Sequence, residues 1–431
     1  MYRNIINDFV VWFEEPKRKI LHLKGAYGVG KTWAVKDFAT AFFSNRIYVD
    51  LDEKNEYLDI IFSQDTEYEE KINMTDKLIE NDFGAFDCTD TLLIFDNLPN
   101  CRECDEFFYN YAKKHRHYVI CLISNSMQIT EFEYGHPDVF RVLRLRPLSF
   151  EEYLIANKAL PLISAVQNNK AKELNPFEIA SITRFLTEYM QTGGMPAIVN
   201  NFIKNKDYNK VREMQLDLIK EYEQKIKSHM SSSLATRCKR IWKSIPKQLC
   251  QDNKKFMYKY VEENARSREY AEATQTLCDL GFIRKMPKLT KGEMPLEDYV
   301  DYKSFQLFLI DHGLLRAIYG NPVGEDVKLE SMLNENNFAV AEQYIFQELS
   351  NKVGPIYYWN SGATARVPFI YEGDGSPIPV DIRFKNNNKA QNIKTFIAKN
   401  PEVNLSVKIS YEQVSLNNNV LNIPIYGLWN L

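Results

Sequence analysis

One segment near the N-terminus constrains the fold of this chain more than any other feature. Residues 25–32 read Gly-Ala-Tyr-Gly-Val-Gly-Lys-Thr and match the pattern G-x-x-x-x-G-K-S/T in full. A β-favouring run at 19–23 precedes the segment, and a helical pattern over 31–43 follows it. The pattern therefore predicts a strand–loop–helix unit that belongs to a parallel α/β sheet.

The chemistry of this segment points to a bound phosphate group. Its glycines allow successive backbone N–H groups to turn toward an anion, and the following helix N-terminus adds partial positive charge. Lys31 is expected to contact the β- and γ-phosphates of ATP, and the Thr32 hydroxyl is expected to bind Mg²⁺. The predicted nucleotide-binding residues are Gly25, Ala26, Tyr27, Gly28, Val29, Gly30, Lys31, Thr32 and Trp33.

A second acidic position follows at the end of another predicted strand. Residues 91–96 read Thr-Leu-Leu-Ile-Phe-Asp, so Asp96 is predicted to hold the metal directly or through water. Many ATPases of this type carry Glu at the next position, where it orients or deprotonates the attacking water. This chain carries Asn97, whose amide can hydrogen-bond water but cannot accept its proton at neutral pH. We therefore predict ATP binding with weak or absent hydrolysis.

The remaining pattern of strands and helices predicts the fold class. Strand-like runs alternate with helical stretches in the first part of the chain, at 46–51, 91–96, 118–124 and 142–148. This alternation indicates a parallel sheet covered on both faces. Helical spacing dominates from 150 to 230. Strand signals return near the C-terminus at 356–359, 365–371 and 378–384, with a hairpin turn expected at 373–376.

Composition and charge restrict the class of protein. The chain has 431 residues, a formal net charge of −3, and 26% charged residues, which is ordinary for globular domains. The stretch 50–110 holds 18 acidic and 4 basic residues, whereas 231–290 holds 13 basic and 6 acidic residues. Only the second stretch is suited to a polyanion such as DNA.

The sequence also predicts where the protein resides. No run approaches the ~18–20 apolar residues that a membrane-spanning helix needs. The seven cysteines, Cys88 among them, lack the spacing of a disulfide framework. We therefore predict a cytoplasmic location without membrane contact.

Several motifs together resemble one family. They are KGAYGVGKTWAVKDFA at 24–39, TLLIFDN at 91–97, RLRPLSFEEYL at 144–154, GGMP at 193–196, SIPKQL at 244–249 and LIDHGLLRAIYG at 309–320. With them, nearly the whole chain resembles prokaryotic AAA-type P-loop ATP-binding proteins, whose C-terminal domain of unknown function often ends in a PD-(D/E)XK nuclease-like module. The resemblance implies a P-loop core at 1–157, a helical lid at 158–230, a winged-helix-like region at 231–325 and an α/β nuclease-like domain at 326–431.

The resemblance also implies roles for individual residues of the core. Ser124 or Asn125 matches the sensor that reads the γ-phosphate, although a simple strand-end turn is the alternative. Arg141 matches an arginine that acts as a finger toward the nucleotide of a neighbouring subunit. The alternative for Arg141 is a solvated surface arginine.

In the C-terminal part the resemblance implies a nuclease-like module that has lost its activity. The positions that match its metal-binding and catalytic residues are Glu342, Pro368, Asp381 and Arg383. Pro368 cannot ligate a metal, and Arg383 is always protonated, so it cannot replace a lysine that exchanges protons. A folded binding or packing element is therefore expected.

The basic stretch 231–290 is the predicted contact for DNA. A helix at 268–280 followed by a strand at 282–286 is typical of a winged-helix-like unit. Cations that could follow a phosphate backbone are Arg266, Arg268, Arg284, Lys285 and Lys288. The alternative is a solvated module that holds a protein partner.

Two classes of function remain open at this stage. The first is an AAA-type ATPase that binds ATP and Mg²⁺, hydrolyses ATP slowly or not at all, and couples its nucleotide state to an inactive nuclease-like module. The second is a nucleotide-gated DNA-binding or scaffold protein without turnover, in which Asn97 keeps ATP intact. Expected partners are ATP, DNA and either another protein or a second copy of the chain.

Overall fold

The chain folds into two units, each with its own sheet. The computed structural model describes residues 1–87, 90–169, 172–228, 230–334, 336, 338–362, 365–384 and 391–431. The N-terminal unit comprises Tyr2–Arg146 with Cys278–Gly281, and the C-terminal unit comprises Met1, Pro147–Leu277 and Phe282–Leu431. Cys88 lies outside the described residues, and no disulfide joins the cysteines within them. The four-part division expected from the sequence stays a prediction.

The N-terminal unit is built on a parallel sheet. Its strands are β1 (Ile20–Lys24), β2 (Asn45–Asp50), β3 (Thr91–Asp96), β4 (Val119–Ser124) and β5 (Phe140–Arg144). They lie in the order β2-β3-β4-β1-β5, and every neighbouring pair is parallel. The carboxyl ends of the strands therefore meet at one edge, which is where open α/β sheets bind ligands.

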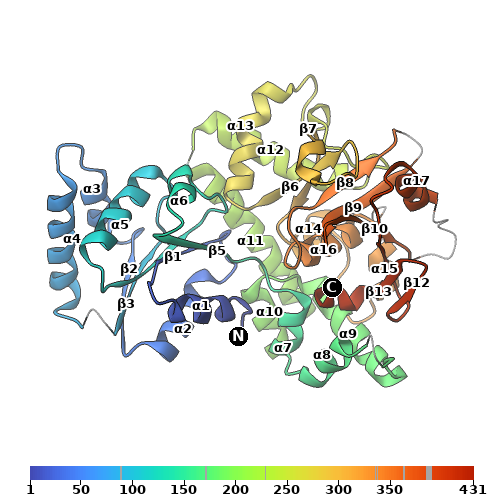
Figure 1. Ribbon diagram of the computed structural model, residues 1–431, viewed down its shortest axis with the longest axis horizontal. Helices are drawn as coiled ribbons and strands as arrows, with labels where there is room; N and C mark the ends of the chain where they lie inside the picture. The colour runs from blue at the N-terminus through green and yellow to red at the C-terminus, as the bar shows by residue number, and fades with distance from the viewer. Residues whose placement is uncertain are drawn as a thin grey trace. The chain divides into compact units, whose positions relative to one another are not determined.

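Helices cover both faces of this sheet (Figure 1). They are α1 (Ile5–Glu14), α2 (Lys31–Phe42), α3 (Asn55–Phe62), α4 (Tyr68–Phe83), α5 (Arg102–Lys114) and α6 (Glu131–Gly135). On one face, alternate strand residues such as Leu93 and Phe95 share a core with Tyr57 of α3 and Phe108 of α5. On the other face α1 packs on α2 through aromatic rings, among them Phe9 and Phe38, whose centroids lie 5.4 Å apart. The predicted parallel α/β core is confirmed.

One strand differs from its expected range. The last strand of the core was expected at 142–148 but spans Phe140–Arg144. The reason is its pairing, because its residues match those of β1 one to one from Ile20 to Lys24. As a result Arg141 lies within the strand rather than before it.

The C-terminal unit combines many helices with a mixed sheet. The helices are α7 (Phe150–Ala156), α8 (Leu160–Gln167), α9 (Pro176–Thr192), α10 (Pro196–Asn205), α11 (Tyr208–Ser228), α12 (Ser232–Leu249), α13 (Ser267–Asp279), α14 (His312–Tyr319), α15 (Leu329–Asn334), α16 (Ala339–Leu349) and α17 (Gln391–Lys399), with 3-10 turns η1 (Tyr258–Tyr260), η2 (Leu296–Tyr299) and η3 (Ile425–Asn430). No described helix combines the length and apolar character that a membrane crossing requires.

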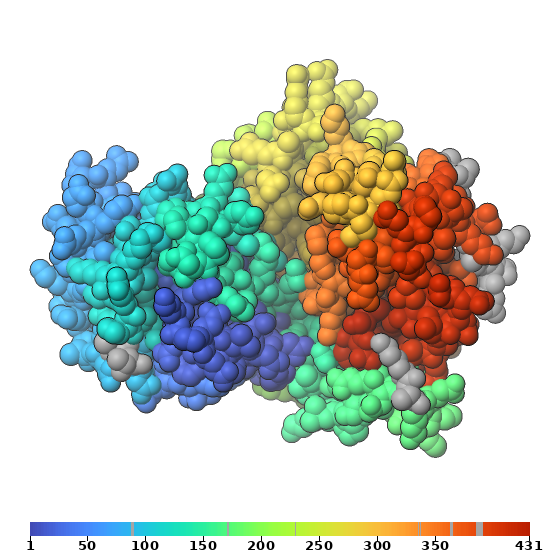
Figure 2. All heavy atoms as spheres, in the orientation of Figure 1, coloured from blue at the N-terminus to red at the C-terminus, as the bar shows by residue number. Residues whose placement is uncertain are grey.

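The sheet of the C-terminal unit joins strands from distant parts of the sequence. Its strands are β6 (Ile283–Leu289), β7 (Val300–Leu309), β8 (Tyr357–Asn360), β9 (Arg366–Gly373), β10 (Ser376–Ile382), β11 (Ser406–Ser410), β12 (Ser415–Asn417) and β13 (Val420–Pro424). They lie in the order β12-β13-β11-β10-β9-β8-β6-β7. The antiparallel hairpin β6–β7 thus extends the sheet formed by the last hundred residues, and Figure 2 shows the hairpin atoms continuous with those strands on the visible face.

Two local features of this unit involve segments that the sequence analysis singled out. The expected hairpin joins β9 to β10, and Asp374 and Gly375 make its turn with φ values of 50° and 70°. The GGMP and LIDHG segments meet, because Gly194 N donates to Asp311 Oδ2 at 2.7 Å and a Cβ on Gly193 would lie 2.3 Å from Asp311 Oδ1. Asp311 also caps α14 by accepting from Leu314 N. The fold class, an α/β core with a second mixed α/β part, is confirmed.

Candidate functional site

The loop between β1 and α2 has the geometry of a phosphate cradle. Gly28 and Gly30 adopt φ values of 82° and 91°, which side chains disfavour. A Cβ on Gly25 would lie 2.5 Å from the carbonyl oxygen of Leu145, so the loop can pass there only as glycine. A glycine-rich loop of this conformation can turn backbone N–H groups toward an anion at the N-terminus of α2.

Lys31 begins α2 and reaches back across the loop. Its buried ammonium donates to the carbonyl oxygens of Gly25 at 3.0 Å and Ala26 at 2.9 Å. It also donates to Oδ1 of Asn125, just beyond the end of β4, at 2.8 Å. The Lys31 ammonium therefore lies in the phosphate cradle, and phosphate oxygens could replace the protein oxygens that it now contacts.

Thr32 and Asp96 form the position suited to a metal ion. The Thr32 hydroxyl donates to Asp96 Oδ2 at 2.5 Å, although the two residues lie on different elements. In the described part of the chain, Asp96 forms no ion pair with a lysine, arginine or histidine. A hydroxyl and an uncompensated carboxylate are hard oxygen donors of the kind that Mg²⁺ prefers. These residues fit Mg²⁺, which would neutralise phosphate charge when bound.

A chain of hydrogen bonds links Lys31 to a second carboxylate. Asn125 Nδ2 donates to Asn97 Oδ1 at 2.8 Å, and Asn97 Nδ2 donates to Asp50 Oδ1 at 2.8 Å. Ionised Asp50 can only accept, and the Lys31 ammonium can only donate, so the two ends fix the orientation of both amides between them. The same edge of the sheet therefore carries one ordered path from β2 to the phosphate cradle.

Sequence reasoning missed Tyr48 and Asp50. The Tyr48 hydroxyl lies 2.9 Å from Asp96 Oδ2 and 3.5 Å from Asp50 Oδ2. Burial and the neighbouring Asp96 raise the pKa of Tyr48, so it stays protonated and can donate. The available signal was the run at 46–51, whose aspartate ends a strand just as Asp96 ends β3.

The comparisons with known proteins agree with this geometry. Residues 17–154 match the family described as AAA domain. The N-terminal unit carries an AAA-type nucleotide-binding domain. Residues 183–324 and 339–426 match two families that are each described only as a domain of unknown function, DUF8612 and DUF4143. No curated protein matches the chain.

Two of the solved structures that match the chain resemble it distantly. One is PCH-2 of C. elegans, with a TM-score of 0.28 and 14% identity over 44% of this chain and 56% of that one. Another is the Pif1 helicase of Candida albicans, with a TM-score of 0.22 and 11% identity over 43% of this chain and 47% of that one. The match thus spans about half of each solved chain, and at these TM-scores neither resemblance bears on function.

The AAA domain brings together most of the residues predicted for its site. Lys31, Thr32, Asp96, Asn97 and Asn125 all meet at the carboxyl edge of the sheet. The alternative sensor residue, Ser124, is instead turned to the carbonyl oxygen of Leu98 and to His22. The Trp33 side chain is 43% exposed at the start of α2.

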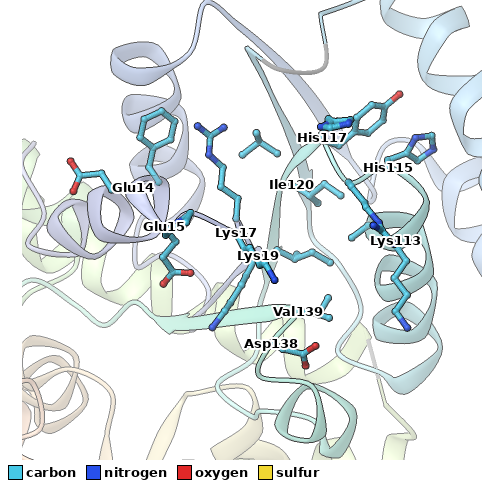
Figure 3. A pocket seen from close by; sticks show the side chains of 18 residues that line it. Glu14, Glu15, Lys17, Lys19, Lys113, His115, His117, Ile120, Asp138 and Val139 are labelled. Atoms are coloured by element: carbon cyan, nitrogen blue, oxygen red, sulfur yellow. The ribbon is translucent and has the colours of Figure 1, made fainter.

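Arg141 lies away from that cluster. It pairs with Leu21 near the amino-terminal end of β1, and its guanidinium forms an ion pair with Glu15 at 3.0 Å. Glu15 lines a hollow of about 1040 Å³ that is formed by the segments leading into β1, β4 and β5 (Figure 3). Its charged and imidazole side chains are Glu14, Glu15, Lys17, Arg18, Lys19, Lys113, His115, Arg116, His117 and Asp138. The role of Arg141 as a finger stays a prediction.

A buried polar cluster anchors the strand that precedes the cradle. Lys24, the last residue of β1, forms an ion pair with Glu133 at 2.7 Å, and Glu133 also lies 2.6 Å from His22. Burial lowers the pKa of His22 to about 4 and raises the pKa of Asp105 to about 7. His22, Asp105 and Glu133 have ligand atoms within 4.8 Å of one another, but the Lys24 ammonium already supplies their positive charge.

The two carboxylates implied for a nuclease centre, Glu342 and Asp381, are paired with cationic side chains. Glu342 of α16 forms ion pairs with Lys254 at 2.9 Å and with Arg366 at 2.7 Å. Burial alone would raise its pKa, but Arg366 and Lys254 outweigh burial and lower the pKa of Glu342 to about 2. Asp381 pairs with Arg383 at 2.7 Å. Both carboxylates are therefore compensated by protein groups rather than left for a metal.

Proposed function

We propose that the AAA domain binds ATP with Mg²⁺ and hydrolyses it slowly, and that nucleotide state governs the C-terminal unit. The observation that carries this proposal is the convergence of Lys31, Thr32 and Asp96 at one edge of the sheet, with Asn125 beside Lys31. Lys31 would bind the β- and γ-phosphates, and Thr32 with Asp96 would hold the metal. When Lys31 turns from the Asn125 amide to the phosphates, that amide would be released to contact the γ-phosphate.

Calorimetry of the full chain tests this proposal. ATP is expected to bind in the presence of Mg²⁺ and to bind more weakly when EDTA removes the metal. Affinity that is the same with and without Mg²⁺ would argue against the Thr32–Asp96 site. Absence of ATP binding under both conditions would remove the proposal.

The C-terminal unit is proposed to act without cleaving nucleic acid. The ion pairs of Glu342 and Asp381 support this, because a divalent metal would have to displace Lys254, Arg366 and Arg383. We therefore expect no cleavage of single- or double-stranded DNA with Mg²⁺ or Mn²⁺. Metal-dependent cleavage that is lost in Asp381→Ala would contradict this expectation.

Nucleic-acid binding is a second candidate function, and one hollow favours it. The lysine hollow is a space of about 890 Å³ between α13 and the hairpin β6–β7, and it is lined by Lys255, Lys259, Lys285, Lys303 and Tyr302, among others. Tyr302 is 71% exposed there, so an aromatic surface lies among cations, which suits bases and phosphates. Of the predicted cations, Lys285 lines this hollow, whereas Arg284 packs over the ring of Phe346.

Salt-dependent DNA binding tests the second function. Wild-type protein is expected to bind DNA weakly at low salt, with an affinity that falls as salt rises. Replacing Lys259, Lys285 and Lys303 with glutamine should lower the slope of log K against log salt by about three. A matched control replaces exposed lysines on α10 and α11, namely Lys204, Lys220 and Lys227. Equal slopes in the two triple variants would remove the lysine hollow from consideration.

A further inference from the structure

The missing carboxylate after Asp96 has a structural substitute. Asn97 occupies the position where a glutamate would activate water, and its amide donates to Asp50 Oδ1 at 2.8 Å. We propose that Asp50 supplies the carboxylate that takes the proton of the attacking water during ATP hydrolysis. This inference rests on the proposed ATP site, and it names the base for the slow hydrolysis proposed there.

The topology places Asp50 at the correct edge of the sheet. Asp50 is the last residue of β2 and lies opposite Asp96, the last residue of β3, in the parallel register. Both carboxylates therefore leave the sheet on the side of the phosphate cradle. Thr32 contacts Asp96 directly, which joins this pair of strand ends to the P-loop helix.

The hydrogen bonds around Asp50 leave one of its oxygens available. Oδ1 accepts from Asn97 Nδ2 at 2.8 Å and from the backbone N–H of Asp52 at 3.1 Å. Oδ2 has a single long contact of 3.5 Å with the Tyr48 hydroxyl, whose proton is better placed for Asp96 at 2.9 Å. Within the described residues no ion pair holds Asp50, and the residue is only half-buried, so part of it lies open to solvent.

The proposed step is a simple proton transfer coupled to phosphoryl transfer. A lone pair of the water oxygen forms a bond to the γ-phosphorus, while the bond from that phosphorus to the β–γ bridging oxygen breaks. The bond electrons leave with ADP, and one proton of the water passes to Asp50 Oδ2. Asp50 then releases this proton to solvent, which restores the carboxylate.

The position of Asn97 explains why an amide, rather than a second acid, stands there. Asn97 Nδ2 lies 2.8 Å from Asp50 Oδ1, so an aspartate of the same shape would set two carboxylate oxygens against each other, and two ionised acids that close repel. Asn97 also has a φ of 58°, a left-handed conformation that asparagine tolerates better than glutamate. Asn97 is thus a positioning residue, which holds Asp50 on one side and Asn125 on the other. For both reasons Asn97→Glu is expected not to raise the rate of ATP hydrolysis.

The test compares Asp50→Asn with Asp52→Asn, which removes the same charge from an exposed neighbour. Wild type and Asp52→Asn should hydrolyse ATP at similar rates, whereas Asp50→Asn should lose roughly 100-fold or more in rate. Calorimetry should show that Asp50→Asn still binds ATP with Mg²⁺ within a few-fold of wild type. The exchange Asp50→Asn/Asn97→Asp returns a carboxylate to the same hydrogen-bonded pair and should recover part of the rate.

The outcomes separate this inference from the proposed function. Turnover in Asp50→Asn equal to that of wild type overturns the inference. Wild-type protein that binds ATP but never hydrolyses it also overturns the inference, while the proposed nucleotide binding stands. Asp50→Asn could lose ATP binding as well as turnover. In that case, a double variant Asp50→Asn/Asn97→Asp that binds ATP again without any turnover would assign Asp50 to binding alone. That result also overturns the inference.

Discussion

Replacing Lys31 with alanine is expected to weaken ATP binding roughly 100-fold or more. The ammonium group would bind two phosphates, and hydrogen bonds to charged groups contribute about 1.5–3 kcal/mol each. The side chain also donates to the carbonyl oxygens of Gly25 and Ala26, so its loss removes hydrogen bonds that hold the loop in shape. Titration calorimetry with ATP and Mg²⁺ measures the effect.

A matched lysine distinguishes loss of the site from general loss of charge. Lys77 is exposed on α4, away from the cradle, and Lys77→Ala should bind ATP like wild type. Thermal unfolding of both variants should show that Lys31→Ala remains folded. Unchanged affinity in folded Lys31→Ala would remove the P-loop as the nucleotide site.

The core of the AAA domain could be predicted from sequence because its signals are local. The glycine pattern lies between a strand and a helix, and the buried strand that ends at Asp96 has no polar interruption. By contrast, α3 and α4 were missed. Their buried residues, such as Tyr57, Ile61 and Ile72, are spread among many acidic residues, so the apolar stripe is thin.

The candidate site was predictable only in part, because strand order is not written in the sequence. Nothing in the run 46–51 says that this strand lies beside β3, yet that adjacency sets Asp50 opposite Asp96. Tyr48 joins the site because residues two apart on a strand share a face, and Asp50 is its neighbour on that face. The hydrogen bond from Asn97 to Asp50 therefore depends on the order of the strands and could not be predicted from the sequence alone.

The C-terminal sheet shows the same limit on a larger scale. The first half of strand β7 includes the exposed Tyr302 and Lys303, which weakens its strand signal. It is held by pairing with β6. β6 in turn meets β8 through Lys288 and Tyr358, which are 70 residues apart in the numbering. Such long-range pairing depends on the register of the whole sheet rather than on any local pattern.

Replacing Glu342 with glutamine is expected to destabilise the C-terminal unit by about 3–5 kcal/mol at neutral pH, because removal of one partner leaves buried charges uncompensated. The side chains of Lys254 and Glu342 are only 2% and 6% exposed, and Arg366 contacts both carboxylate oxygens. Hydrogen exchange of the α16 amides, followed by mass spectrometry, measures this loss within the unit itself. Glu372→Gln, an exposed change on β9, should leave that exchange unaltered.

The destabilisation caused by Glu342→Gln is expected to depend on pH in a defined direction. Because the pKa of Glu342 is lowered to about 2 from an ordinary value of 4.5, its ionised form is favoured in the folded state. The stabilisation is therefore complete above pH 4.5 and is lost as pH falls from there toward 2. The difference between wild type and Glu342→Gln should be constant from pH 6 to 8 and should shrink in acid. A difference that grows in acid would contradict the ion-pair explanation.

Added metal separates the ion-pair role of Glu342 from a ligand role. If Lys254 and Arg366 already neutralise this carboxylate, Mn²⁺ has no vacant oxygen to bind, and wild-type exchange at α16 should not change when the ion is added. A functional nuclease centre would instead gain protection from bound metal, since a ligand of the folded state stabilises it by mass action. Hydrogen exchange at α16 that slows with Mn²⁺ in wild type but not in Glu342→Gln would show that the metal displaces Lys254 and Arg366. That result would support nuclease chemistry.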